Sequence, residues 1–131
     1  MTDSSDLSNV EITFGLADPE LEDDQSLKFA KKLLPELRQL DEVEKADRTE
    51  DVDPEMGAKM GLATIVGLLT SHVNILNLKG FLGWLSDRVP DKPIKIKMKY
   101  AGNEVEIEAK SSEELKKAIQ SIKELFGEIN V

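Results

Sequence analysis

The chain has 131 residues, a net charge of −9 at pH 7 and no cysteine. This length suits one domain with a single core, and the absence of cysteine excludes disulfides, thiolate metal sites and cysteine nucleophiles. The negative charge argues against nucleic-acid binding, because affinity for the phosphate backbone comes mainly from Lys and Arg.

The acidic side chains are concentrated in the first half of the chain. Residues 1–56 carry 17 acidic and 6 basic side chains. Residues 1–9 are acidic or small and polar, without the basic region and apolar core of a signal peptide. We therefore predict a mobile N-terminal tail over 1–9, a single domain over 10–131 and a cytoplasmic location.

The first elements are predicted to be a strand and a helix. Val10–Leu16 alternates apolar with polar or small residues, which is typical of a strand with one buried face. Asp18 and Pro19, followed by the acidic stretch Glu20–Asp24, suit the start of a helix. Pro35 is expected to kink or end this helix. Its buried stripe comprises Leu27, Ala30, Leu33, Leu34 and Leu37.

The middle of the chain is dominated by a long uncharged run. A short edge strand is predicted within Leu40–Arg48, followed by a linker over Thr49–Glu55. Met60–Leu78 then contains nineteen residues without a charge. We predict a helix over Met56–Ser71, a break around His72–Asn74, and a second helix over Leu78–Arg88 with Asn77 as its cap.

This uncharged run raises the question of a membrane span. Nineteen helical residues reach about 28 Å, close to the roughly 30 Å of a hydrocarbon core. His72, Asn74 and Asn77 offset the gain from the apolar side chains. We therefore expect burial of Met60, Ile65, Leu68 and Leu69 within the protein or a homo-oligomer, with membrane contact as the alternative.

The last third predicts a hairpin and a helix. Ile94, Ile96 and Met98 alternate with lysines, and Val105, Ile107 and Ala109 alternate with glutamates, on either side of the turn Ala101–Asn103. The aliphatic side chains should be buried and the Lys/Glu ladder exposed. Ser111–Glu114 forms a capping box for the final helix. The inner face of that helix comprises Leu115, Ala118, Ile119, Ile122, Leu125, Phe126 and Ile129.

The predicted order is β-α-β-α-α-β-β-α. Because each strand alternates, one sheet face should be buried, so the fold class is an α+β two-layer sandwich of about four strands with helices on one face. Two helices fill such a face. We therefore expect the second central helix to keep an exposed apolar edge at Phe81, Trp84 and Leu85 that binds a partner.

No motif predicts catalysis, a metal or a cofactor. Ser71 and His72 are adjacent in sequence, but a triad needs groups that converge in space with an orienting acid. The acidic run Asp47–Asp53 has the alternation of a calcium loop without its glycine or its final Glu, for which Ala58 stands. Gly57, Gly61 and Gly67 precede no P-loop Lys-Ser/Thr pair. We expect no enzyme activity.

Several of these motifs together resemble a known family. Leu33–Arg38 (Leu-Leu-Pro-Glu-Leu-Arg), the Met56-Gly57 entry to the apolar run, Phe81–Leu85 (Phe-Leu-Gly-Trp-Leu), the Lys-rich strand and Gly102-x-x-Val105-x-Ile107 resemble the type-one effector-associated constant component proteins of bacterial conflict systems. The likeness covers about Val10 to Leu125. The family's known alanine-rich central segment contains Ile, Asn and His in this chain.

The resemblance implies an accessory component encoded beside protease-like or other effectors in immune or programmed-death modules, with no catalytic residues. The expected function is therefore an adaptor that binds a larger effector, and the expected partners are that protein and a second copy of the chain. A membrane-associating component that uses the apolar segment 56–88 is the alternative.

Overall fold

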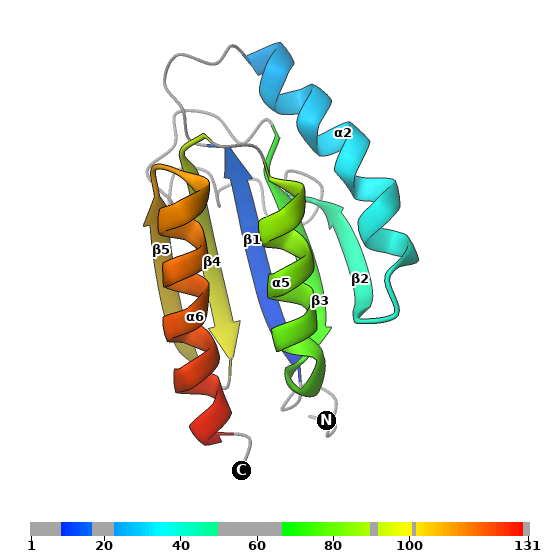
Figure 1. The fold of residues 1–131 in the computed structure, drawn as a ribbon. Coiled ribbons are helices and arrows are strands. Elements are labelled where there is room, and N and C mark those ends of the chain that lie inside the picture. Colours follow the sequence, from blue (N-terminus) through cyan, green and yellow to red (C-terminus); the bar gives the residue numbers. More distant parts are fainter. Residues whose placement is uncertain (1–8, 17–22, 50–66, 90–91, 101, 130–131) are drawn as a thin grey trace.

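The fold is an α+β sandwich in which helices cover one face of an antiparallel sheet (Figure 1). This computed structural model describes residues 9–16, 23–49, 67–89, 92–100 and 102–129. The predicted fold class is confirmed, although the sheet has five strands rather than about four. Residues 1–8 of the expected tail over 1–9 lie outside the described part, whereas Asn9 already belongs to the first strand.

The strands lie in the order β2-β3-β1-β4-β5, and every neighbouring pair is antiparallel. They are β1 (Asn9–Leu16), β2 (Val43–Arg48), β3 (Leu69–Asn74), β4 (Ile94–Tyr100) and β5 (Asn103–Ala109). Alternation along β1 places Val10, Ile12 and Phe14 on the helix-covered face. The predicted strands β1, β4 and β5 and the predicted edge strand β2 are thus confirmed.

Among the described elements, β1, α2, β2, β3, α5 and β4 form two interleaved split β-α-β units. β1 and β2 are parallel with β3 between them, and β3 and β4 are parallel with β1 between them. This β-α-β-β-α-β connectivity is that of ferredoxin-like folds. The hairpin partner β5 and the final helix extend the unit at the β4 edge.

Three helices cover the buried face within the described residues: α2 (Asp23–Gln39), α5 (Leu78–Arg88) and α6 (Ser112–Ile129). Figure 1 shows α5 over the middle of the sheet, α6 beside it toward the β5 edge, and α2 toward the β2 edge. Pro35 does not end α2, which continues to Gln39 with the Pro35 ring exposed.

The helix starts agree only in part with the sequence-based expectations. Ser111 caps α6, since its Oγ accepts a hydrogen bond from the Glu114 amide at 3.2 Å. The bounds of α5 are those predicted, but the Asn77 side chain makes no capping hydrogen bond. Asn74 instead caps the short 3₁₀ turn η1 (Ile75–Asn77), accepting from the Leu76 amide at 2.9 Å.

The predicted helix over Met56–Ser71 is wrong at its C-terminal end. Leu69–Asn74 forms β3, an interior strand hydrogen-bonded to β2 on one side and β1 on the other. Residues 56–66 lie outside the described part. The predicted burial of Leu68 and Leu69 is confirmed, whereas Met60 and Ile65 are not described.

The hairpin differs from the prediction at Val105 and Ile107, which are half-buried rather than buried, and at one lysine. Ile94, Ile96 and Met98 are buried as predicted, but the Lys97 side chain is only 7% exposed. Lys97 lies directly between Thr13 of β1 and Glu106 of β5. Its aliphatic stem is covered while its Nζ lies 3.5 Å from Glu104 Oε2 and 3.9 Å from Glu106 Oε1.

Candidate protein-interaction site

A groove between α2 and α5 is the candidate interaction site. It has a volume of about 340 Å³ and combines an apolar floor with charged walls. Its lining residues are Phe29, Lys32, Leu33 and Glu36 from α2, and Asp87 and Arg88 from α5. Within α2, each of the four lining residues is three or four positions from two of the others, and they therefore share one helix face.

Trp84 lies one helical turn before Arg88 on α5, next to the groove through its contact with Arg88 but not itself part of the lining. The Arg88 guanidinium carbon lies 5.6 Å from the Trp84 ring centroid, a cation–π distance. Arg88 Nη1 also lies 3.9 Å from Glu36 Oε1, so this side chain bridges α5 to α2. The Trp84 ring is half-buried and stacks on Phe81, with centroids 6.3 Å apart and planes at 29°.

The predicted apolar edge is therefore wrong for two of its three residues. Phe81 and Leu85 are fully buried in the core between α5 and the sheet. The five-stranded sheet is wide enough for a third helix, so the inner stripe of α5 is covered rather than left free. Trp84 retains partial exposure, and its binding of a partner stays a prediction.

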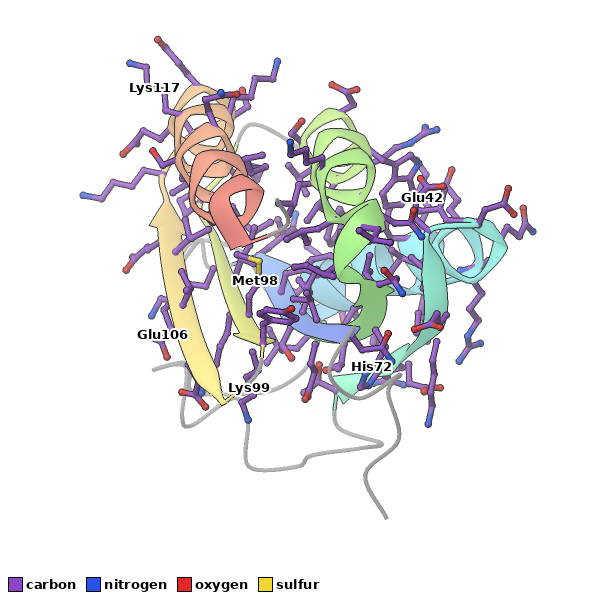
Figure 2. The ribbon with its side chains drawn as sticks, turned by 90° about the horizontal axis from the view of Figure 1, so that it is seen from below. Glu42, His72, Met98, Lys99, Glu106 and Lys117 are labelled. Carbon is purple, nitrogen blue, oxygen red and sulfur yellow. The ribbon has the colours of Figure 1, made fainter. Side chains whose placement is uncertain are left out.

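The face of the sheet opposite the helices, here called the second face, carries a row of polar side chains that the sequence patterns did not predict. Successive strands place side chains directly opposite one another in the order Asp47, Thr70, Thr13, Lys97 and Glu106. Figure 2 shows the two faces at β4, where Met98 points toward the helical layer and Lys99 points away from it. This row joins residues that are far apart in sequence, so no local residue pattern predicts it.

Threonine hydroxyls connect the middle of the row. The Thr70 Oγ1 lies 3.0 Å from Thr13 Oγ1 and 2.8 Å from Thr49 Oγ1, and all three side chains are buried. Each hydroxyl can donate one hydrogen bond and accept two. The cluster therefore satisfies buried polar groups within the sheet.

Ser71 and His72 do not form a catalytic pair. As neighbours on β3 they point to opposite faces of the sheet. Ser71 is buried on the helix-covered face, where its Oγ has no hydrogen-bond partner among the described residues. His72 lies on the second face between Lys45 of β2 and Glu11 of β1.

Of the acidic side chains in the run Asp47–Asp53, the structure describes only Asp47, which has structural partners. Asp47 accepts a hydrogen bond from Arg38 Nη2 at 3.1 Å, and its other oxygen lies 3.9 Å from Lys45 Nζ. Among the described residues, no group of His, Cys, Asp and Glu side chains could hold a metal ion. None of the helices in that same part is long and apolar enough to cross a membrane.

Comparisons with family models, with curated proteins and with solved structures found no match to this chain.

Proposed function

We propose that this chain is a non-enzymatic adaptor that binds a larger protein effector of a bacterial conflict or programmed-death system through the α2/α5 groove. The observation that carries the proposal is Trp84, which is half-buried, stacks on the buried Phe81 and contacts the groove-lining Arg88. A rigid aromatic side chain with remaining exposed surface is typical of an interface hot spot.

The position of the family-like motifs supports the same surface. Leu33–Arg38 lies in α2 and Phe81–Leu85 lies in α5, so both motifs belong to the helices that line the groove. The groove combines an apolar floor with two basic and two acidic side chains. Such a lining fits an amphipathic protein segment, which supplies apolar anchors and charged flanks together.

No observation on the described residues favours the membrane-associating alternative. The segment Leu69–Asn74 is an interior strand with backbone hydrogen bonds on both sides. Leu78, Leu82 and Leu85, which give α5 its apolar character, contact the core. Insertion of these residues into lipid requires the sheet and its helical layer to separate.

The first prediction concerns Trp84. The effector encoded beside this chain should bind Trp84→Ala at least about 2 kcal/mol more weakly than the parent, because truncation removes the anchor. Isothermal titration of the purified proteins measures this difference. Circular dichroism and thermal unfolding should show a retained fold, since part of the ring already faces solvent.

Leu76→Ala provides the matched control, because Leu76 is an apolar residue that is 74% exposed and lies in η1, outside both the groove lining and the Trp84–Arg88 pair. Its affinity should equal that of the parent. Equal affinities for parent and Trp84→Ala would refute the groove as the effector-binding surface. If Trp84→Ala unfolds, Arg88→Ala becomes the deciding variant. Unchanged effector binding by Arg88→Ala would likewise refute the groove as the effector-binding surface.

A further inference from the structure

The two edges of the sheet are protected to different degrees. At the β2 edge, Arg38 of α2 donates a hydrogen bond from Nε to the Ala46 carbonyl at 2.9 Å. The pairing of β2 with β3 is also irregular between Val43 and Lys45. A side chain bonded to the edge and a bulge are both devices that prevent strand addition.

Within the described part of the chain, β5 has neither device. Its seven residues pair with β4 in an uninterrupted register from Ile94 opposite Ala109 to Tyr100 opposite Asn103. Among the hydrogen bonds of the described residues, none fills its outer edge. A regular edge strand of this length presents unpaired backbone groups to another strand.

The hairpin geometry identifies which residues present those groups. Two residues separate Tyr100 from Asn103, so these two flank the turn and form its first hydrogen-bonded pair. Hydrogen-bonded and non-hydrogen-bonded pairs alternate from there in an antiparallel ladder. The outward N–H and C=O groups therefore belong to Glu104, Glu106 and Glu108.

The side chains of the same three residues determine what chemistry fits the edge. Glu104, Glu106 and Glu108 are exposed on the second face, while Val105 and Ile107 lie half-buried on the helix-covered face. Side chains directly opposite on an added strand come within about 4.5–5.5 Å at Cβ. The best occupant thus has basic residues opposite the glutamates and apolar residues opposite Val105 and Ile107.

The chain's own β4 already satisfies this pattern on the other side of β5. Lys95, Lys97 and Lys99 lie directly opposite the three glutamates. A hollow of about 240 Å³ on the hairpin gives room for further long side chains. Its lining residues are Lys95, Ile96, Glu106, Ile107 and Glu108.

A second copy of the chain does not fit this edge. Antiparallel pairing of β5 with another β5 would place one glutamate ladder opposite the other, and like charges directly opposite destabilise a sheet. We propose that β5 accepts, as a sixth strand, an extended basic segment of a partner protein in which Lys or Arg alternates with apolar residues. This mode of recognition is β-augmentation.

The edge lies across the sheet from α2 and β2, so this surface is separate from the α2/α5 groove (Figure 1). The test uses a fluorescent, end-capped peptide of about nine residues, the length of an ordinary strand, that alternates Lys with Ile. A peptide of the same composition with its lysines grouped together is the control for charge alone. Fluorescence anisotropy should give roughly tenfold tighter binding to the alternating peptide.

A double substitution locates the binding surface. Glu106→Gln with Glu108→Gln removes two edge carboxylates and should weaken the alternating peptide about tenfold. The matched control, Asp41→Asn with Glu44→Gln, removes two exposed carboxylates near the opposite edge and should leave affinity within about twofold. Equal loss in both doubles would show binding to net charge and overturn the proposal.

Amide hydrogen exchange tests the backbone pairing directly. The bound peptide should slow exchange at Glu104, Glu106 and Glu108, whose N–H groups point outward, and leave the already paired Val105 and Ile107 amides unchanged. Equal binding of the two peptides, or binding without protection of these three amides, would overturn the proposal.

Discussion

Thr70 is the residue on which the buried hydroxyl cluster depends. It lies on an interior strand between Thr13 of β1 and the Asp47–Thr49 end of β2. Its Oγ1 is within hydrogen-bond distance of the Oγ1 atoms of Thr13 and Thr49, so it pairs with two other buried hydroxyls. The cost of an unpaired buried hydroxyl exceeds the net gain of a single hydrogen bond.

Thr70→Val should lower the free energy of unfolding by about 1–3 kcal/mol, because valine keeps the shape but leaves two buried hydroxyls unpaired. Replacing Thr13, Thr49 and Thr70 together by Val should recover most of this loss, since no polar group is then orphaned. Urea unfolding of the three proteins measures the differences. A triple variant less stable than Thr70→Val would contradict this account.

The β4–β5 hairpin shows how position within the sheet sets the burial of similar side chains. Ile96 and Ile107 are directly opposite and share a face, yet Ile96 is buried and Ile107 is only partly buried. β4 has a strand on each side, whereas β5 is at the edge. The neighbouring strand, rather than the residue type, completes the burial of Ile96.

Ile96→Ala should therefore destabilise the fold by about 2–5 kcal/mol, the usual range for a fully buried aliphatic side chain. Ile107→Ala should cost less than about 2 kcal/mol, since less apolar area is lost to water. Chemical denaturation of both variants under one set of conditions compares them. Equal costs would place β5 deeper in the core than its edge position indicates.

At the scale of the whole molecule, one hydrophobic core joins all three helices to the sheet. Buried residues of α2, α5 and α6 belong to the same cluster as those of the strands. The strands β3, β1 and β4 are paired on both sides, while β2 and β5 are paired on one. Resistance to local opening should therefore be greatest in the middle of the sheet.

Hydrogen exchange should show this gradient in the free protein. The amides of Ile12 in β1 and Val73 in β3 should exchange only through global unfolding, since each strand has a partner on both sides. The outward amide of Glu106 in β5 should exchange orders of magnitude faster. Comparable rates for Val73 and Glu106 would contradict the assignment of β3 to the interior.

Local patterns determined the elements whose signals are self-contained. Alternation in Val10–Leu16 and in the two hairpin strands predicted β1, β4 and β5, and the capping box at Ser111 predicted the start of α6. These signals need no knowledge of neighbours, because side-chain period and end capping are properties of a single segment.

The tertiary structure alone decided β3 and the surfaces that depend on it. Leu69–Asn74 continues an uncharged run that looks helical, but pairing with β1 and β2 places Leu69 and Val73 in the core and Thr70 beside the other threonines. The same packing buries Phe81 and Lys97 and brings α2 beside Arg88 to form the groove. Contacts between distant segments carry no local period, so the sequence by itself predicted the class of the fold but not these contacts.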